Sequence, residues 1–275
     1  MTLRSESFGM TSPPAESKTA APVGSNLEWQ AWGEKDPLFG VIPQEGRERG
    51  GSQPWTDRDF YETGRVDWEE LSQRWQRYGL NPESCVEIGC GAGRLTRFIA
   101  DTFSKVHGVD VAEGMIEYAR EHMPMNVELH VTNGMTLPVP DSSATGVFSV
   151  IVFLHFDRKE HAAAYFREMA RVLKSGGAIM IQLPLHSWPS NTKPLMRRSL
   201  AGLHNGYMFL RRLKGAYHRY RLSRKQWSPF MQSMSYDTEW LQRTLEGLGF
   251  RDIETCAFRL TRGGATYSWV LARKV

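Results

Sequence analysis

The chain has 275 residues, of which 41% are hydrophobic, and a formal net charge of +4. This length and hydrophobic content suffice to bury the core of a seven-stranded sheet in one domain. Its three cysteines exclude a disulfide framework, and none has metal-ligand spacing, so we predict no metal site. No apolar run approaches about 18 residues and no charged leader precedes one, so we expect a cytoplasmic chain without a membrane-spanning helix.

The N-terminal part divides into two segments by composition. Residues 1–25 are rich in Ser, Thr, Pro and Ala, which predicts a disordered tail. Residues 26–80 are rich in aromatic side chains and are expected to form a helical cap, with one helix beginning at an Asp67 N-cap. That helix is predicted to bury Trp68, Leu71, Trp75 and Tyr78. Residues 81–275 are expected to form the main domain.

A glycine-rich turn is the most informative feature of the main domain. The segment Cys85-Val-Glu-Ile-Gly-Cys-Gly-Ala-Gly-Arg-Leu95 has the pattern of a buried strand, a turn and a helix start, and Val109-Asp110 ends the next predicted strand. The glycines allow a ligand to approach the backbone closely. Asp110 is placed to accept hydrogen bonds from both hydroxyls of a ribose. The pattern therefore predicts a site for an adenosine-containing cofactor at the carboxyl ends of two parallel strands.

Glu87, inside the turn, indicates which cofactor this is. A carboxylate would repel the pyrophosphate of a dinucleotide, whereas it would attract the ammonium group of an amino acid. The pattern Glu-x-Gly-x-Gly-x-Gly, followed by an acidic residue after the second strand, resembles the class I S-adenosylmethionine-dependent methyltransferases. The resemblance covers residues 84–184. It implies S-adenosylmethionine as the cofactor, with Glu87 at its methionine part and Asp110 at its ribose.

The resemblance also assigns the remaining cofactor contacts. Asn133 stands where the family usually has an acid that accepts from the adenine amino group, and its amide oxygen can replace that acceptor. Gly146, before the fourth strand, is a second departure from the family pattern. The full set of predicted cofactor-binding residues is Tyr61, Glu87, Gly89, Cys90, Gly91, Gly93, Asp110, Val111, Met115, Asn133, Gly134, Met135, Ser149 and Val150.

Alternation and helical spacing predict the other elements. The predicted strands after the first are 105–110, 127–131, 147–153, 178–183, 250–260 and 265–273. The predicted helices are 95–103, 113–122, one over 162–173 closed by a left-handed glycine cap in Lys174–Gly177, and one capped by Asp237. Together with the resemblance, they predict an α/β fold: a doubly wound, seven-stranded, mostly parallel sheet (Rossmann-like methyltransferase fold) with an antiparallel C-terminal hairpin and a helical insertion after the fifth strand.

The insertion, residues 186–236, holds ten Lys or Arg residues and no Asp or Glu, while the rest of the chain has 24 basic and 30 acidic residues. In the family this region forms the lid over the methyl acceptor. We consider three interpretations: a pair of lid helices that binds an anionic acceptor, an amphipathic segment over 208–222 that contacts a membrane surface, or a solvated face or homodimer contact. Nucleic acid is the least supported partner, because the aromatic residues form no RNA-binding motif.

Methyl transfer from a sulfonium is an in-line displacement that depends mostly on positioning. The candidate base is His155, just beyond the fourth strand, with Asp157 placed to orient it, although a histidine that only packs is an open alternative. His186 and Tyr236 are further candidates. The sequence thus predicts an enzyme that methylates an oxygen, nitrogen or carbon of a small molecule or glycan precursor, expected to be anionic. The alternatives are a protein or RNA methyltransferase, an inactive cofactor-binding scaffold and, least favoured, a nicotinamide oxidoreductase.

Overall fold

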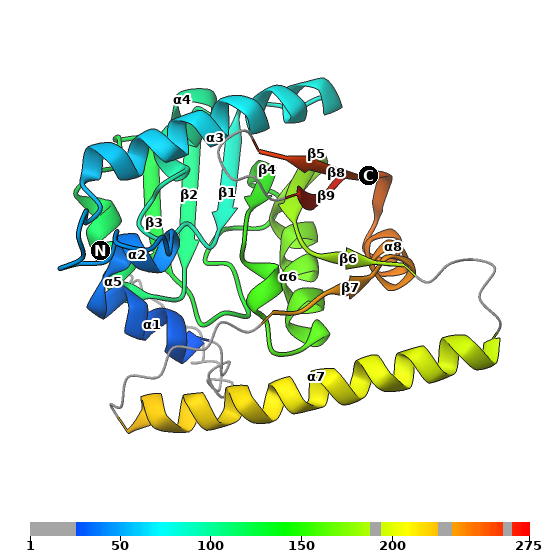
Figure 1. The fold of residues 1–275 in the computed structure, drawn as a ribbon. Coiled ribbons are helices and arrows are strands. Elements are labelled where there is room, and N and C mark those ends of the chain that lie inside the picture. The colour runs from blue at the N-terminus through cyan, green and yellow to red at the C-terminus, as the bar shows by residue number, and fades with distance from the viewer. Residues whose placement is uncertain (1–25, 188–193, 225–232, 261–265) are drawn as a thin grey trace, which may run out of the picture.

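A mixed sheet forms the centre of the computed structural model, which describes residues 26–187, 194–224, 233–260 and 266–275 (Figure 1). Its strand order is β3-β2-β1-β4-β5-β9-β8, with β1 to β5 parallel and β9 antiparallel to both neighbours. This confirms the predicted fold class and the C-terminal hairpin at the sheet edge. The strands are β1 Ser84–Ile88, β2 Lys105–Asp110, β3 Val127–Val131, β4 Ala144–Ser149, β5 Leu173–Gln182, β8 Phe250–Arg259 and β9 Thr266–Lys274.

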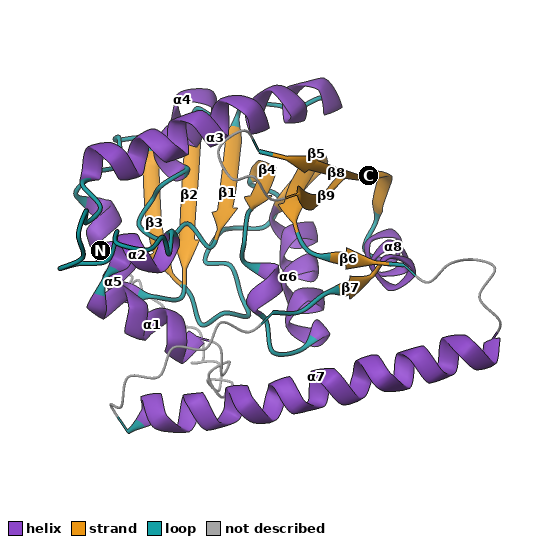
Figure 2. Cartoon of the chain, viewed as in Figure 1, coloured by secondary structure: helices purple, strands orange, loops and turns teal. Residues whose placement is uncertain are grey.

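Helices cover both faces of the sheet, which makes three layers (Figure 2). On one face, Trp75 of α3 and Phe103 after α4 pack against Phe148 of β4. On the other face, α6 and α8 bury an apolar stripe against β4 and β5. The helices are α1 Asn26–Lys35, α2 Pro37–Val41, α3 Asp57–Tyr78, α4 Thr96–Thr102, α5 Glu113–Arg120, α6 Lys159–Val172, α7 Pro194–Ser223 and α8 Thr238–Gly247.

The fourth strand differs from its prediction over 147–153. β4 ends at Ser149, Ile151 takes a left-handed φ of 55°, and Phe153–His155 form the short 3-10 helix η1. The Ile151 N–H donates to the Gln182 side chain on β5 at 2.8 Å, which holds the chain out of the sheet. The apolar run continues past the strand because Phe153 still enters the core, stacked on Phe166 of α6. Apolarity therefore predicted burial correctly but not the conformation.

The glycine cap predicted after α6 is also wrong. The helix ends at Val172, and β5 begins at the next residue, where Leu173 already pairs with Ala144 of β4. Gly176 has a left-handed φ of 79°, but it lies in an irregularity between β4 and β5 rather than at a helix end. The left-handed glycine that the sequence indicates thus belongs to a β-bulge.

The cap helix begins earlier than predicted. α3 starts at Asp57, where the Thr56 hydroxyl accepts from the Asp59 N–H at 3.1 Å. Asp67 lies inside α3, where its carboxylate binds Arg94 and caps no helix. The Asp237 N-cap of α8 is confirmed, because its carboxylate accepts from the Trp240 N–H at 2.9 Å. The predicted tail 1–25 lies outside the described residues.

The insertion contains one long described helix, α7, as a helical insertion predicts; a pair of lid helices was one of the three interpretations considered. A short parallel pair, β6 Leu185–His186 and β7 Tyr236–Asp237, joins the two ends of the insertion. Figure 1 shows α7 beyond the carboxyl ends of β1 to β4, and α7 packs against α1. The insertion therefore lies on the side of the sheet where the family resemblance places a lid.

Candidate active site

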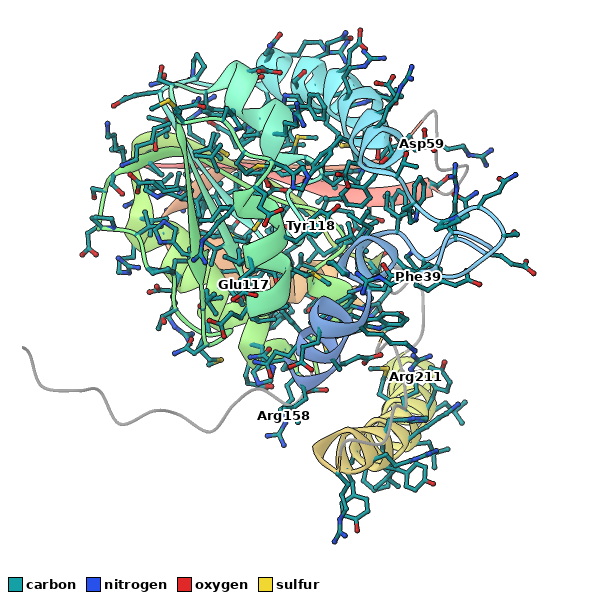
Figure 3. The ribbon with its side chains drawn as sticks, turned by 90° about the vertical axis from the view of Figure 1, so that its left-hand side faces the viewer. Phe39, Asp59, Glu117, Tyr118, Arg158 and Arg211 are labelled. Carbon is teal, nitrogen blue, oxygen red and sulfur yellow. The ribbon has the colours of Figure 1, made fainter. Side chains whose placement is uncertain are left out.

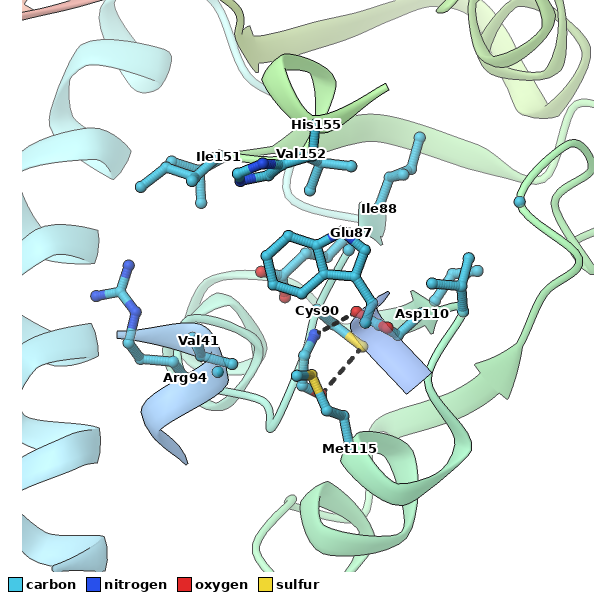
Figure 4. Close-up of a pocket in the computed structure, with 18 of the residues that line it drawn as sticks. Val41, Glu87, Ile88, Cys90, Arg94, Asp110, Met115, Ile151, Val152 and His155 are labelled. Carbon is cyan, nitrogen blue, oxygen red and sulfur yellow. Dashed lines mark hydrogen bonds between the residues drawn. The ribbon is translucent and has the colours of Figure 1, made fainter. Parts of the chain in front are cut away.

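A cavity of about 930 Å³ lies at the carboxyl ends of β1, β2 and β4 (Figure 4). The strand order reverses between β1 and β4, and such a switch point is where open α/β sheets bind their ligands. The cavity is lined by Asn26, Trp29, Gly40, Val41, Glu87, Ile88, Gly89, Cys90, Gly91, Arg94, Leu95, Val109, Asp110, Val111, Met115, Gly134, Val150, Ile151, Val152, His155, Phe156 and Tyr165.

The glycine turn after β1 forms one wall. Gly89 and Gly91 both have a left-handed φ, 73° and 53°, and a Cβ at Gly91 would lie 2.7 Å from the Val41 side chain. Only glycine accepts this conformation at little cost, and only glycine leaves the wall open to a ligand. The Gly89 N–H donates to Val109 O at 2.7 Å, so the turn is fixed to the end of β2. Cys90 is buried, which raises the pKa of its thiol well above the ordinary value and excludes a thiolate nucleophile at neutral pH.

Asp110, the last residue of β2, faces the same wall. One carboxylate oxygen accepts from the Gly91 N–H at 2.8 Å and the other from the Ala112 N–H at 2.9 Å. Each oxygen has a second lone pair, so the carboxylate is placed to accept from a ribose diol. Burial raises the pKa of Asp110, and the backbone hydrogen bonds oppose that shift. The Gly91 N–H is therefore bound to Asp110 and is not free for a ligand.

Glu87, near the end of β1, is almost fully buried, with 2% of its surface exposed. Its Oε2 accepts from the Thr96 hydroxyl at 2.6 Å. Burial raises the pKa of Glu87 to about 7, while Thr96 and the nearby Arg94 hold it lower than burial alone would. A cationic ligand group in the cavity would stabilise the charged form of this carboxylate.

A buried ion pair supports the turn from behind. Arg94 binds the Asp67 carboxylate at 2.5 Å, and both side chains are less than 10% exposed. Tyr61, predicted to contact the cofactor, instead donates its hydroxyl to Ala92 O at 2.9 Å and does not line the cavity. Gly64 of α3 packs so closely that a Cβ there would lie 1.9 Å from Arg94 O. These α3 residues position the turn without touching its ligand face.

The N-terminal helices α1 and α2 close the cavity from the other side. Asn26 donates to Asn133 O at 2.9 Å, and Trp29 and Val41 line the cavity. The aromatic-rich composition of 26–80 predicted a cover, but it did not indicate which residues face the ligand. Met115 of α5 forms the adjoining wall.

The loop after β3 contributes backbone rather than side chains. The Asn133 amide oxygen accepts from the Met135 and Thr136 N–H groups at 2.9 and 3.1 Å, which forms a local turn. Of this loop, Gly134 lines the cavity, whereas Asn133 and Met135 do not. The Asn133 side chain thus satisfies its own loop, and its use for adenine stays a prediction.

The floor comes from the segment after β4. Val150 lines the cavity, whereas Ser149 donates its hydroxyl to Ile88 O at 2.9 Å, inside the sheet. Gly93, another predicted contact, faces Met123 and Ala119 and lies outside the lining. The left-handed Ile151, next to Val150, also lines the cavity. A strained β-branched residue at such a place is typical of functional sites.

His155 lies in η1 on the side of the cavity opposite Met115 (Figure 4). It is 6% exposed, and its ring contacts the edge of Trp29 with centroids 4.7 Å apart. Phe156 and Tyr165, stacked on each other, continue this wall. Asp157, predicted to orient His155, does not line the cavity.

The two further candidate bases lie outside the lining as well. Tyr236 donates its hydroxyl to Phe153 O at 2.6 Å, and His186 is in the short strand β6. The cationic side chains that the structure describes on α7, namely Arg211, Lys214 and Arg221, also do not line the cavity. The expected role of the basic insertion in binding the acceptor therefore has no support from the described residues.

The site fits S-adenosylmethionine better than a dinucleotide. Asp110 matches the ribose diol that both cofactors carry, whereas Glu87 matches an ammonium group and would repel a pyrophosphate. Arg94, the lining cation, is already bound to Asp67.

Comparisons with known proteins agree with this assignment. Residues 85–177 match the family model described as a methyltransferase domain. Malonyl-acyl-carrier-protein O-methyltransferase of Hahella chejuensis is 33% identical over 102 residues, 36% of each chain. Probable tRNA methyltransferase 9B of Bos taurus is 32% identical over 132 residues, 45% of this chain and 28% of the relative. The chain thus spans only about a third of the length of the relatives it matches.

A solved structure extends the likeness to the whole fold. Magnesium protoporphyrin IX methyltransferase of Synechocystis PCC 6803 with bound SAH has a TM-score of 0.52 at 14% identity, over 86% of this chain and 93% of that one. At this identity the likeness concerns the fold alone. Residues 85–177 therefore resemble a methyltransferase domain, and the fold of the chain agrees with that likeness.

Proposed function

We propose that this chain transfers a methyl group from S-adenosylmethionine to a nucleophile of a small organic acceptor. One observation carries the proposal: Glu87, Asp110 and His155 line the same cavity at the switch point of the sheet. The carboxylates of Glu87 and Asp110 suit the methionine and ribose parts of the cofactor. His155 stands on the opposite wall, where an acceptor would meet the methyl group.

The cofactor contacts follow from the groups that face the cavity. Glu87 binds the ammonium group, and Asp110 accepts from the two ribose hydroxyls. The Gly134 backbone and the Met115 side chain enclose the adenine, while Val111 and Val150 contact the adenosine and the floor of the cavity. Gly89 and Gly91 let the chain approach the methionine part without a side chain in between.

The acceptor side is mainly apolar. Bound S-adenosylmethionine supplies a methyl group that is already activated, so the chain needs only to position and desolvate the nucleophile. Trp29, Ile151 and Phe156 exclude water from that side. An imidazole nitrogen of His155 accepts the proton when the nucleophile is a hydroxyl or a protonated amine. The expected anionic character of the acceptor is a separate prediction, which rests on the charge of residues 186–236.

A macromolecular acceptor is the competing function, because one relative is a probable tRNA methyltransferase. The burial of His155 favours the small acceptor, because this side chain is 6% exposed and the Trp29 ring of α1 lies against it. A nucleotide or protein side chain would have to enter fully beneath α1. An inactive scaffold differs from both, since it would bind the cofactor without turnover.

A label-transfer experiment tests the function. Full-length protein and methyl-labelled S-adenosylmethionine are added to cell extract separated into small-molecule, lipid, protein and nucleic-acid fractions. We expect label in the small-molecule or lipid fraction with the wild type and much less with His155→Gln. Label in protein or RNA would contradict the small acceptor, and cofactor binding without S-adenosylhomocysteine in any fraction would indicate a scaffold.

A further inference from the structure

The outer face of α7 exposes a row of large apolar side chains. They are between 53% and 73% exposed and comprise Leu203, Tyr207, Phe209, Leu210, Leu213, Tyr217 and Tyr220. At 100° per residue, all seven fall within an arc of roughly 160°. Met208 lies on the opposite side of α7 and is 8% exposed, because it packs into the core of the body. Figure 3 shows α7 nearly end-on, with side chains directed away from the body.

Positive charge accompanies this apolar face. The segment 186–236 holds ten Lys or Arg and no Asp or Glu. Lys214 of α7 and Arg224, the residue after the helix, are both exposed, and by helical position Lys214 lies among the apolar side chains. Arg224 is placed over the Tyr220 ring, 5.3 Å from its centroid. Lysine and arginine have an apolar stem and a cationic head, and tyrosine has an apolar ring and a hydroxyl. Such side chains bury the apolar part and keep the polar end in water.

We propose that α7 docks on an anionic membrane surface, lying in its plane with this apolar face among the lipid headgroups. The interspersed cations argue against a second copy as the occupant, since two such faces would bring like charges together, and protein interfaces are depleted in lysine. An anionic lipid surface complements both the charge and the apolar face. Among the described residues, no helix is long and apolar enough to cross a bilayer, so α7 lies on the surface.

The position of α7 connects docking to the cavity. α7 packs against α1, and Trp29 of α1 lines the cavity. Docking would hold the α1 side of the cavity near the lipid. The proposal rests on the surface of α7 alone and does not depend on the proposed methyl acceptor.

Vesicle co-sedimentation of the full chain tests the proposal. Binding is measured to phosphatidylcholine vesicles with and without phosphatidylglycerol, at low and high salt. We expect strong binding only with phosphatidylglycerol and weaker binding at high salt. Leu210→Ser with Tyr217→Ser, and separately Lys214→Gln with Arg224→Gln, should each weaken that binding about tenfold or more.

A matched control separates docking from general stickiness. Met125→Ser with Arg120→Gln makes the same kinds of exposed change away from α7, and it should leave vesicle binding unchanged. Each variant should unfold at the wild-type temperature, which excludes misfolding as the cause. Wild-type protein that binds neither vesicle would overturn the proposal, as would an α7 variant that only converts a dimer to a monomer. Equal loss of binding in the control would overturn it too.

Discussion

Replacing Glu87 by Gln tests the electrostatics of the site most sharply. Burial raises the pKa of this carboxyl from 4.5 to about 7. Between these values the native state keeps a proton that the unfolded chain releases, so wild-type stability falls as pH rises through this window. Above pH 7 the ionised Glu87 carboxylate lowers the free energy of unfolding by its full amount, about 3 kcal/mol at 1.36 kcal/mol per pKa unit. Glutamine has nearly the same shape and no charge.

At pH 8, Glu87→Gln should therefore have a free energy of unfolding that is higher than that of the wild type by up to about 3 kcal/mol. The difference should shrink toward zero as the pH falls below 4.5, where Glu87 becomes protonated in both states. Urea unfolding followed by tryptophan fluorescence, repeated across this range without cofactor, measures it. A difference that does not change with pH, or that grows toward low pH, would refute the reasoning. Glu83→Gln, which removes a carboxylate from an exposed position beside Lys174, is the control.

The same variant tests cofactor binding, with the opposite sign. A ligand ammonium group favours the charged form of Glu87, so wild-type affinity should rise with pH up to about 7 and then level off. The affinity of Glu87→Gln should be lower at pH 8 and nearly independent of pH. Calorimetric titration of both proteins with S-adenosylmethionine gives this comparison. Equal affinity at pH 8 would mean that Glu87 does not contact the ammonium group.

Three other residues give separate predictions. Asp110→Asn should weaken S-adenosylmethionine binding at least about tenfold, because a charge-assisted acceptor for the ribose is lost; unchanged affinity in the same titration would contradict this. His155→Gln should lower the turnover of the labelled product about a hundredfold or more with cofactor affinity unchanged, whereas an equal loss of affinity would mean that His155 only packs. Asp67→Ala should lower the free energy of unfolding in urea by about 3 kcal/mol, since it removes the carboxylate that binds buried Arg94; a change as small as that of a surface substitution would refute this.

The sequence predicted the sheet well, and it placed Glu87 and Asp110 at one edge of that sheet, because both depend on short-range patterns. Strands 105–110 and 127–131 have the predicted bounds. Glu87 and Asp110 meet in one cavity because parallel strands end at the same edge of the sheet. The spacing within each motif was enough to place these groups.

Contacts made by tertiary packing could not be predicted in this way. Trp29 lines the cavity only because α1 packs across it, and Tyr165 has the same helical spacing as any core residue. Asn133 has a side chain suited to adenine, but a local turn already uses its oxygen. Tyr61 supports the glycine turn through Ala92 instead of facing the ligand. In each case a hydrogen bond or a packed helix, invisible along the sequence, decided where the side chain points.

A crystal structure with S-adenosylhomocysteine tests the central claim most directly. The account predicts the ligand in the cavity between the glycine turn and α1, with its ribose hydroxyls on Asp110, its ammonium group on Glu87 and its sulfur toward His155. A ligand bound elsewhere, or bound there with the ribose away from Asp110, would contradict it.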